Sequence, residues 1–180
     1  MTGRLIAVVG PSGVGKDTVM EALRSARPDI ALVRRVITRP SEAGGEDFDG
    51  VTEEAFKAQQ VAGAFVLSWQ AHGLSYGIPK SIRHRLDAGE DMLINLSRAV
   101  LAEAQDAFPS LQVINLTASK EVLAKRLAAR GRETAEDISR RLDRKGAALP
   151  PTCNVLEIDN SGALDATLEK ILNALYPVSA

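Results

Sequence analysis

Short apolar runs alternate along the chain with stretches in which apolar residues recur at helical spacing. This alternation predicts an α/β fold, with a parallel sheet flanked by helices. Four apolar runs are predicted to be buried strands: Leu5–Val9, Met92–Leu96, Val113–Leu116 and Val155–Ile158. Serine caps, glycine or proline stops and the apolar spacing predict the main helices: Thr18–Arg27, Ser97–Phe108, Ser119–Gly131 and Ala163–Leu175.

Two segments interrupt this α/β rhythm. The first, Leu32 to Leu86, mixes short strand-like runs with glycines and one predicted helix, Glu53–Ala62. The second, Arg130 to Lys145, is dense in arginine. Both segments are therefore expected to be inserts carried by the sheet.

Composition limits the partners. A chain of 180 residues suits one domain, and a net charge of -1 gives no global field that would attract nucleic acid or a membrane surface. The single cysteine, Cys153, fits a reducing compartment. The run Leu5–Val9 is too short for a signal peptide or a membrane span. We expect a cytoplasmic protein, a monomer or homodimer, whose partners are small molecules.

A glycine-rich loop follows the first predicted strand and precedes a helix, which is the context of a phosphate-binding loop. Its residues are Gly10, Pro11, Ser12, Gly13, Val14, Gly15 and Lys16. Such a loop points backbone N–H groups at phosphates, and its lysine reaches the β- and γ-phosphates. The alternative, a glycine-rich turn without a ligand, is disfavoured by this context.

The residue after the loop lysine is Asp17, where the motif normally carries Ser or Thr. A carboxylate is a suitable hard ligand for Mg²⁺. The sequence therefore predicts that Asp17 binds the metal, directly or through water, or that Thr18 supplies the hydroxyl. The alternative is that Asp17 only caps the helix, because carboxylates stabilise helix N-termini.

The segment from Lys120 to Lys145 carries a net charge of +4. Guanidinium groups suit phosphate oxygens, and a mobile arginine-rich lid excludes water during phosphoryl transfer. Next to a phosphate loop, this segment is predicted to be a lid. The alternative is a solvated helix face, and Arg132 and Arg140 are the members for which it fits best.

Taken together, these motifs resemble the guanylate kinases over nearly the whole chain. The resemblance implies binding of ATP and Mg²⁺ by a P-loop kinase with a core at about 1–31, 87–125 and 146–180, an acceptor-binding insert at 32–86 and a lid at 126–145. "VITRP" matches the segment that carries an acceptor-phosphate arginine, which implies that role for Arg39. "RLAARGRETAEDISRRL" matches the lid, and "IDNSG" matches a loop near the adenine. The residues implied for ATP binding or catalysis are Lys16, Arg126, Arg130, Arg141 and Asn160.

The chain also departs from the guanylate kinases. Guanylate kinases recognise guanine with a glutamate and a hydroxyl, and the matching positions in this chain are Leu67 and Ile78. A second acceptor-phosphate arginine, expected near position 41 or 42, is missing, and an acidic residue after the central strand is Asn95. Guanine placed against two aliphatic side chains would leave buried N–H groups unpaired. The residues expected to bind ATP, the phosphoryl donor, are therefore retained, whereas those expected to bind the phosphoryl acceptor differ.

The rebuilt segments resemble a family related to the guanylate kinases, the ribose 1,5-bisphosphate phosphokinases of phosphonate breakdown. The segments that carry this resemblance are "TRPSEAGGED", "WQAHGLSYGIP" and "NLSR". The resemblance implies transfer of the ATP γ-phosphoryl group to a sugar phosphate, giving 5-phosphoribosyl 1-diphosphate. The candidate sugar-phosphate ligands are Glu46, Asp47, His72, Tyr76, Ser97 and Arg98.

Each of these candidates has a structural alternative. Tyr76 suits a core aromatic, His72 a backbone-bonded loop residue and Ser97 a helix cap. Glu46, Asp47 and Arg98 would be solvated, and Trp69 is expected to pack. Two other functions also stay open: a nucleoside monophosphate kinase, and an inactive guanylate-kinase-like module that binds a peptide.

Overall fold

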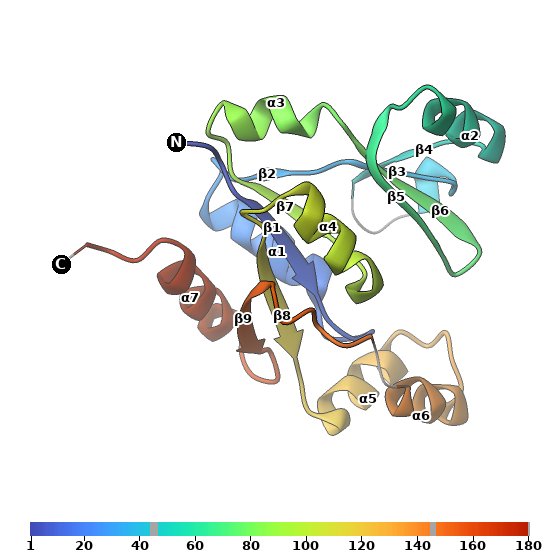
Figure 1. The fold of residues 1–180 in the computed structure, drawn as a ribbon. Helices are drawn as coiled ribbons and strands as arrows, with labels where there is room; N and C mark the ends of the chain where they lie inside the picture. The colour runs from blue at the N-terminus through green and yellow to red at the C-terminus, as the bar shows by residue number, and fades with distance from the viewer. Residues whose placement is uncertain (44–46, 145–146, 180) are drawn as a thin grey trace.

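The parallel sheet predicted from the apolar runs is present in the computed structural model, which describes residues 1–43, 47–144 and 147–179 (Figure 1). The five strands of this sheet all run parallel. Across the sheet their order is β2 (Ala31–Leu32), β7 (Met92–Asn95), β1 (Leu5–Val9), β8 (Gln112–Thr117) and β9 (Asn154–Asp159). The four predicted strands are thus confirmed, and the short edge strand β2 is an addition.

Helices cover both faces of the sheet, because alternate strand residues point in opposite directions. Leu5, Ala7 and Val9 of β1 pack with α3 (Ile82–Asp87) and α4 (Leu101–Ala107). Ile6 and Val8 pack on the other face with α1 (Lys16–Ala26) and α7 (Leu164–Leu175). The predicted layering is confirmed.

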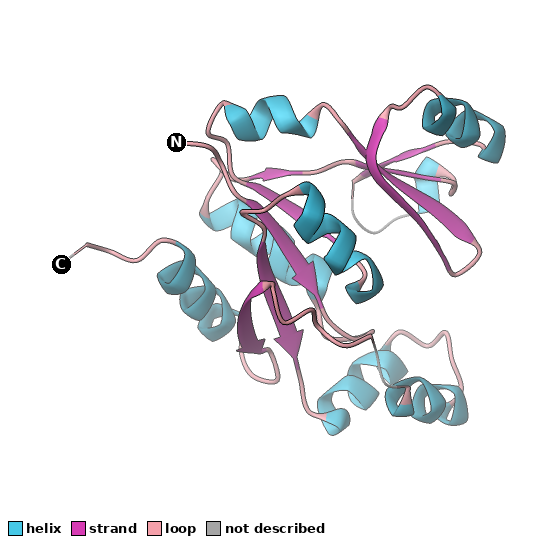
Figure 2. Ribbon diagram, in the orientation of Figure 1, coloured by secondary structure: helices cyan, strands magenta, loops and turns pink. Residues whose placement is uncertain are grey.

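The part of the chain that connects β2 to α3 forms a second sheet of four strands (Figure 2). Its strands, in spatial order, are β4 (Phe48–Gly50), β3 (Arg35–Ile37), β6 (Leu74–Pro79) and β5 (Phe65–Ala71). The 3₁₀ turn η1 (Ser41–Ala43) precedes β4, and α2 (Glu53–Val61) packs on the sheet through Phe56 and Phe65, whose ring centroids are 4.8 Å apart. We call residues 33–81 the insert.

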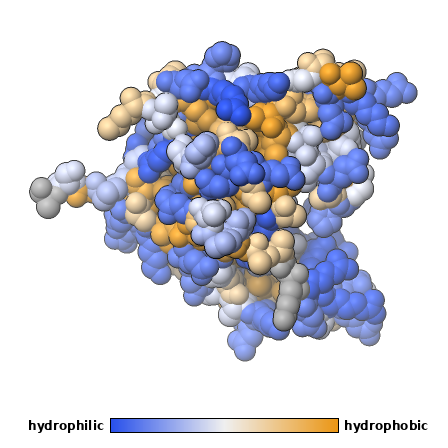
Figure 3. All heavy atoms as spheres, in the orientation of Figure 1, coloured by the Kyte–Doolittle hydropathy of each residue, from blue (hydrophilic) through white to orange (hydrophobic). Residues whose placement is uncertain are grey.

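The arginine-rich segment forms two helices, α5 (Lys120–Ala129) and α6 (Ala135–Asp143). Ser119 caps α5 by accepting a hydrogen bond from the Val122 N–H, and Gly131 follows the helix with a φ of 64°. We call residues 126–143 the lid. The insert and the lid lie on either side of the end of β1 (Figure 1), and hydrophilic side chains cover the lid on the face drawn in Figure 3.

The structure differs from the sequence prediction at two helix starts. Helix α1 begins at Lys16 because Gly15, with a φ of 95°, ends the loop there. Ser97 does cap, but the turn that follows is the 3₁₀ helix η2 (Arg98–Val100), and α4 begins only at Leu101. Among the described residues, none of the helices is long and apolar enough to cross a membrane.

Asp91, just before β7, ties three distant segments together. Its carboxylate accepts hydrogen bonds from the Arg4 backbone N–H at 2.7 Å, the Arg4 guanidinium at 3.0 Å and the Tyr176 hydroxyl at 2.6 Å. Burial alone would raise the pKa of Asp91, but the bonds from Tyr176 and Arg4 hold it below its ordinary value. Burial and the bond to Asp91 raise the pKa of Tyr176 to about 12. The start of β1, the start of β7 and the end of α7 are therefore joined electrostatically.

Tyr176→Phe is expected to lower the free energy of unfolding by about 1–3 kcal/mol at neutral pH, because it removes a hydrogen bond to a charged group. Since the folded-state pKa of Tyr176 is raised, its contribution is full below its ordinary pKa and is lost as the pH rises toward about 12. Urea unfolding of both proteins across this pH range measures the difference. A double-mutant cycle with Asp91→Asn isolates the pair, and a zero coupling energy would contradict the assignment.

Candidate active site

The loop between β1 and α1 has the backbone needed to surround phosphates. Gly13 and Gly15 adopt φ values of 84° and 95°, in the left-handed region that favours glycine. A Cβ on Gly10 would stand 2.7 Å from the Leu116 carbonyl oxygen, so no other residue fits there. The Lys16 ammonium donates to the Gly10 carbonyl oxygen at 3.0 Å. This geometry supports the predicted phosphate loop.

Two polar side chains clamp this loop from outside. The Asn160 amide donates to the Val14 carbonyl at 2.7 Å and accepts from the Thr167 hydroxyl at 2.7 Å. The Arg126 guanidinium donates to the Val14 carbonyl at 3.1 Å and to the Asn160 carbonyl at 2.7 Å. These polar groups are thus engaged with the protein, so Asn160 and Arg126 position the loop.

Beside the loop lies a hollow of about 300 Å³. Its lining residues come from the loop, α1, the lid and the turn after β9: Gly13, Gly15, Thr18, Arg126, Arg130, Asn160, Gly162 and Leu164. The hollow thus connects the phosphate loop with the loop that the resemblance associates with adenine, and it is a suitable place for a nucleotide.

Positive charge converges on Lys16 from three other segments. Burial lowers the pKa of Lys16, and Arg35, Arg98 and Arg130 lower it further, while Asp17 opposes the shift. Arg35 comes from the insert, Arg98 from the turn after β7, and Arg130 from the end of α5. Such a cluster fits negative charge shared by several phosphate oxygens.

Asp17 and Thr18 are both exposed in the first turn of α1. The Asp17 carboxylate accepts a hydrogen bond from the Asn95 amide at 3.4 Å. Within the described ranges, no group of three or more His, Cys, Asp or Glu side chains is placed to hold a metal by itself. One carboxylate and one hydroxyl next to a phosphate loop nevertheless fit Mg²⁺, which takes few protein ligands and completes its shell with water and phosphate oxygens.

Arg98 lies at the carboxyl edge of the sheet. Its guanidinium donates to the Asn115 amide oxygen at 2.8 Å, and its Nε is buried without a hydrogen-bond partner among the described residues. The neighbouring Ser97 hydroxyl instead accepts from the Ala99 N–H at 3.3 Å. The structure therefore places Arg98 near Lys16 and gives Ser97 a capping contact.

The side of the insert sheet that faces the nucleotide core is apolar and aromatic. Leu67 and Ile78 are 7% and 0% exposed and belong to the core cluster that includes Val9 of β1. Tyr76 stacks on Trp69 with a centroid distance of 5.2 Å and an interplanar angle of 7°. Arg39 lies over the Phe48 ring, 4.3 Å from its centroid.

The structure does not gather all the predicted acceptor residues. His72 is exposed at the tip of the β5–β6 hairpin, where a φ of 53° together with Gly73 closes a tight turn. Asp47 is exposed, and its charge acts on Arg34 outside the cationic cluster. Glu46 lies outside the described residues. The positions of His72 and Asp47 thus give no support to a ligand role.

The lid arginines divide into two groups. Arg130 lines the nucleotide hollow and lowers the pKa of Lys16. Arg141 pairs with Glu133 of the lid at 2.6 Å, in a second hollow that Asp137, Arg140 and Arg144 also line. In this arrangement Arg141 is held within the lid.

One member of the cationic cluster escaped the sequence analysis. Arg35 is 9% exposed, and burial lowers its pKa to about 10. In the sequence it is the second residue of the Arg-Arg pair that precedes Val36 and Ile37. A charged residue at the start of a strand usually faces solvent, and only the fold shows that this one is buried.

The sequence matches the protein family described as guanylate kinase over residues 2–175. A protein named ribose 1,5-bisphosphate phosphokinase from Ruegeria sp. is 53% identical over 92% of this chain and 88% of its own length. A protein of the same name from Agrobacterium fabrum is 46% identical over 95% of each chain. The crystal structure of guanylate kinase from Anaplasma phagocytophilum superposes with a TM-score of 0.70 at 21% identity, covering 97% of this chain and 85% of that one. The structural likeness supports the same fold.

Asn160→Ala is expected to weaken ADP binding about tenfold and to lower the free energy of unfolding by about 1–3 kcal/mol, because it leaves the Val14 carbonyl and the Thr167 hydroxyl without their partner. Calorimetric titration with ADP and urea unfolding measure the two effects. Asn154→Ala is the matched control, since its amide bond to Gln112 is exposed. Equal effects of the two substitutions would contradict the clamp.

Proposed function

Because the chain belongs to the guanylate kinase family, we propose that it transfers the γ-phosphoryl group of ATP to the 1-phosphate of ribose 1,5-bisphosphate. The products are ADP and 5-phosphoribosyl 1-diphosphate. The names of the relatives suggest this acceptor, and the rebuilt acceptor side of the site supports it. The cluster around Lys16 argues against an inactive binding module, which would not need four convergent cations.

The observation that carries the choice of acceptor is the burial of Leu67 and Ile78 in the core cluster. By resemblance, these are the two positions from which guanylate kinases read guanine. Neither side chain offers a hydrogen bond, and each unpaired polar group of a buried purine would cost about 1–3 kcal/mol. A ribose phosphate needs no such partners, so the aliphatic pair discriminates against a nucleotide acceptor.

ATP is proposed to bind with its phosphates in the loop from Gly10 to Lys16 and its adenine in the hollow next to Asn160. Lys16 contacts the β- and γ-phosphates, and Arg130 closes the site from the lid. Asp17 and Thr18 are the residues that would hold Mg²⁺, which supplies charge neutralisation between the phosphates.

In the transfer step, an oxygen of the acceptor phosphate forms a bond to the γ-phosphorus as the bond to the ADP oxygen breaks. The attacking oxygen is anionic near neutral pH, so no general base is required. Lys16, Arg98 and Arg130 stabilise the charge that spreads over the transferred group. Arg141 contributes to this stabilisation only when its guanidinium leaves Glu133 and binds a phosphate. Arg39 and Tyr76 are assigned to the acceptor.

Purified protein with Mg²⁺ and ATP is expected to release ADP with ribose 1,5-bisphosphate at least about 100-fold faster than with GMP, since sites that lack polar partners discriminate strongly. Coupled ADP detection gives the rates, and ³¹P NMR shows the diphosphate product. Lys16→Ala is expected to lower turnover by about 10²–10³-fold, which separates the activity from a contaminant. Faster turnover with GMP would reject the proposal in favour of a nucleotide kinase.

Asp17→Asn is expected to raise the Mg²⁺ concentration needed for half-maximal ADP binding about tenfold, because the amide lacks the charge that a hard cation prefers. Fluorescence titration with a labelled ADP at varied Mg²⁺ reports binding without turnover. Glu21→Gln, an exposed carboxylate further along α1, is the control. An unchanged Mg²⁺ requirement would leave Asp17 with a capping role only.

A further inference from the structure

Arg35 begins β3 of the insert and is buried, although an arginine normally keeps its head group in water. Burial lowers the pKa of Arg35 to about 10; the nearby Tyr76 and Asp17 oppose this shift, and Arg39 adds to it. Burying a guanidinium is costly and is weak evidence of a stabilising role. Arg35 is buried beside Tyr76, Asp17 and Arg39, which places it next to the candidate active site.

The insert sheet fixes the direction of the Arg35 side chain. Ile37 lies two residues along β3 and pairs with Tyr76, which in turn pairs with Trp69, so these side chains share one face of the sheet. Arg35 lies on that face with its guanidinium 5.1 Å from the centre of the Tyr76 ring. The ring of Tyr76 is itself stacked on Trp69. The Arg35 guanidinium is thus positioned next to a ring that is itself held by packing.

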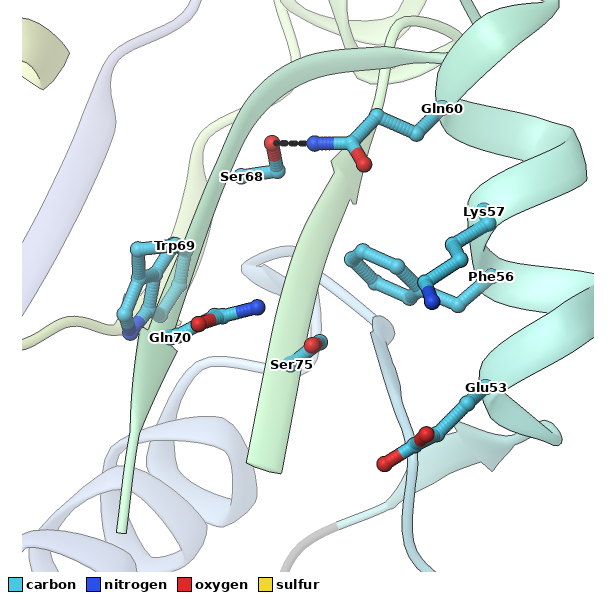
Figure 4. A pocket seen from close by; sticks show the side chains of 8 residues that line it. All are labelled: Glu53, Phe56, Lys57, Gln60, Ser68, Trp69, Gln70 and Ser75. Carbon is cyan, nitrogen blue, oxygen red and sulfur yellow. Dashed lines mark hydrogen bonds between the residues drawn. The ribbon is translucent and has the colours of Figure 1, made fainter. Parts of the chain in front are cut away.

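The opposite face of the same sheet serves a different purpose. It carries Ser68 and Ser75, which line a polar hollow of about 380 Å³ against α2 (Figure 4). In that view Phe56, Lys57 and Glu53 approach the hollow from α2, and Trp69 of β5 lies at its other side. Arg35 therefore belongs to the face that looks toward the phosphate loop.

The charge of Arg35 interacts with residues of both proposed phosphate sites. On one side its charge acts on Lys16, the residue that contacts the γ-phosphate. On the other side it is coupled to Arg39, the residue assigned to the acceptor phosphate. Two phosphate groups that must approach each other repel, and a cation fixed between them lowers that repulsion without reorganising.

Building on the proposed function, we propose that Arg35 binds the acceptor phosphate at the point of phosphoryl transfer, with its guanidinium positioned next to the Tyr76 ring. Arg35 is then a specificity-determining residue: it requires an anionic acceptor next to the γ-phosphate. Arg39 contacts the same substrate. The fork of an arginine is needed to bridge two oxygens, so a lysine is only a partial substitute.

The test compares Arg35→Met, which keeps an unbranched apolar stem against Tyr76, with Arg34→Met. Arg34 is the adjacent residue, and its side chain is 53% exposed and pairs with Asp49 at 2.8 Å. Arg35→Met is expected to raise KM for ribose 1,5-bisphosphate at least about 30-fold and to lower kcat about 10²-fold. KM for ATP and the Kd of ADP are expected to change less than about threefold, and Arg34→Met is expected to match the wild type.

Two further measurements separate a ligand role from a structural one. Free guanidinium is expected to restore part of the turnover of Arg35→Ala, and Arg35→Lys is expected to fall between the wild type and Arg35→Met. Calorimetry with ribose 1,5-bisphosphate on the ADP-bound protein tests binding without chemistry. If the wild type binds and Arg35→Met binds equally well, the inference fails and the proposed function stands. If the wild type neither binds nor turns over this acceptor, both fail.

Discussion

The repulsion among the cations that converge on Lys16, of which Arg35 is the most deeply buried, shapes the whole site. Four segments that are distant in sequence bring Lys16, Arg35, Arg98 and Arg130 together, and burial lowers the pKa of Lys16 and Arg35. Like charges that lie close together raise the free energy of the folded state. Under the proposed function, polyanionic substrates would offset that cost, so the same groups would stabilise the reacting complex.

Such a cluster keeps its shape only if its supports are rigid. The carbonyl of Val14 is held by both Asn160 and Arg126, so the phosphate loop is fixed to the turn after β9 and to the first lid helix. Arg98 is held by Asn115 of β8, and Arg35 by the ring of Tyr76. Arg98 and Arg35 are thus each held by an uncharged neighbour, which would keep the loss of side-chain entropy on substrate binding small.

The proposed acceptor side keeps the fold of a guanylate kinase but not the polar side chains that a purine would need. Leu67 and Ile78 join the apolar core and no longer offer polar contacts. The neighbouring positions on the same face carry Tyr76 and Arg35, which suit hydroxyl and phosphate groups. Under the proposed function, one face of a single small sheet would both exclude a base and favour an anion.

The sequence by itself determined the parallel sheet, its flanking helices and the phosphate loop, because these depend on local periodicity, on glycine φ values and on the short distance from β1 to α1. It also identified Leu67 and Ile78 as aliphatic where a purine would need polar partners. Contacts between distant segments were decided only by the tertiary structure. The burial of Arg35, the use of Asn160 and Arg126 as clamps and the pairing of Arg141 with Glu133 each join residues that no local pattern connects. The sequence indicated that an acceptor arginine was missing near position 41, whereas the proposal of Arg35 in its place depends on the burial and direction of a side chain of β3.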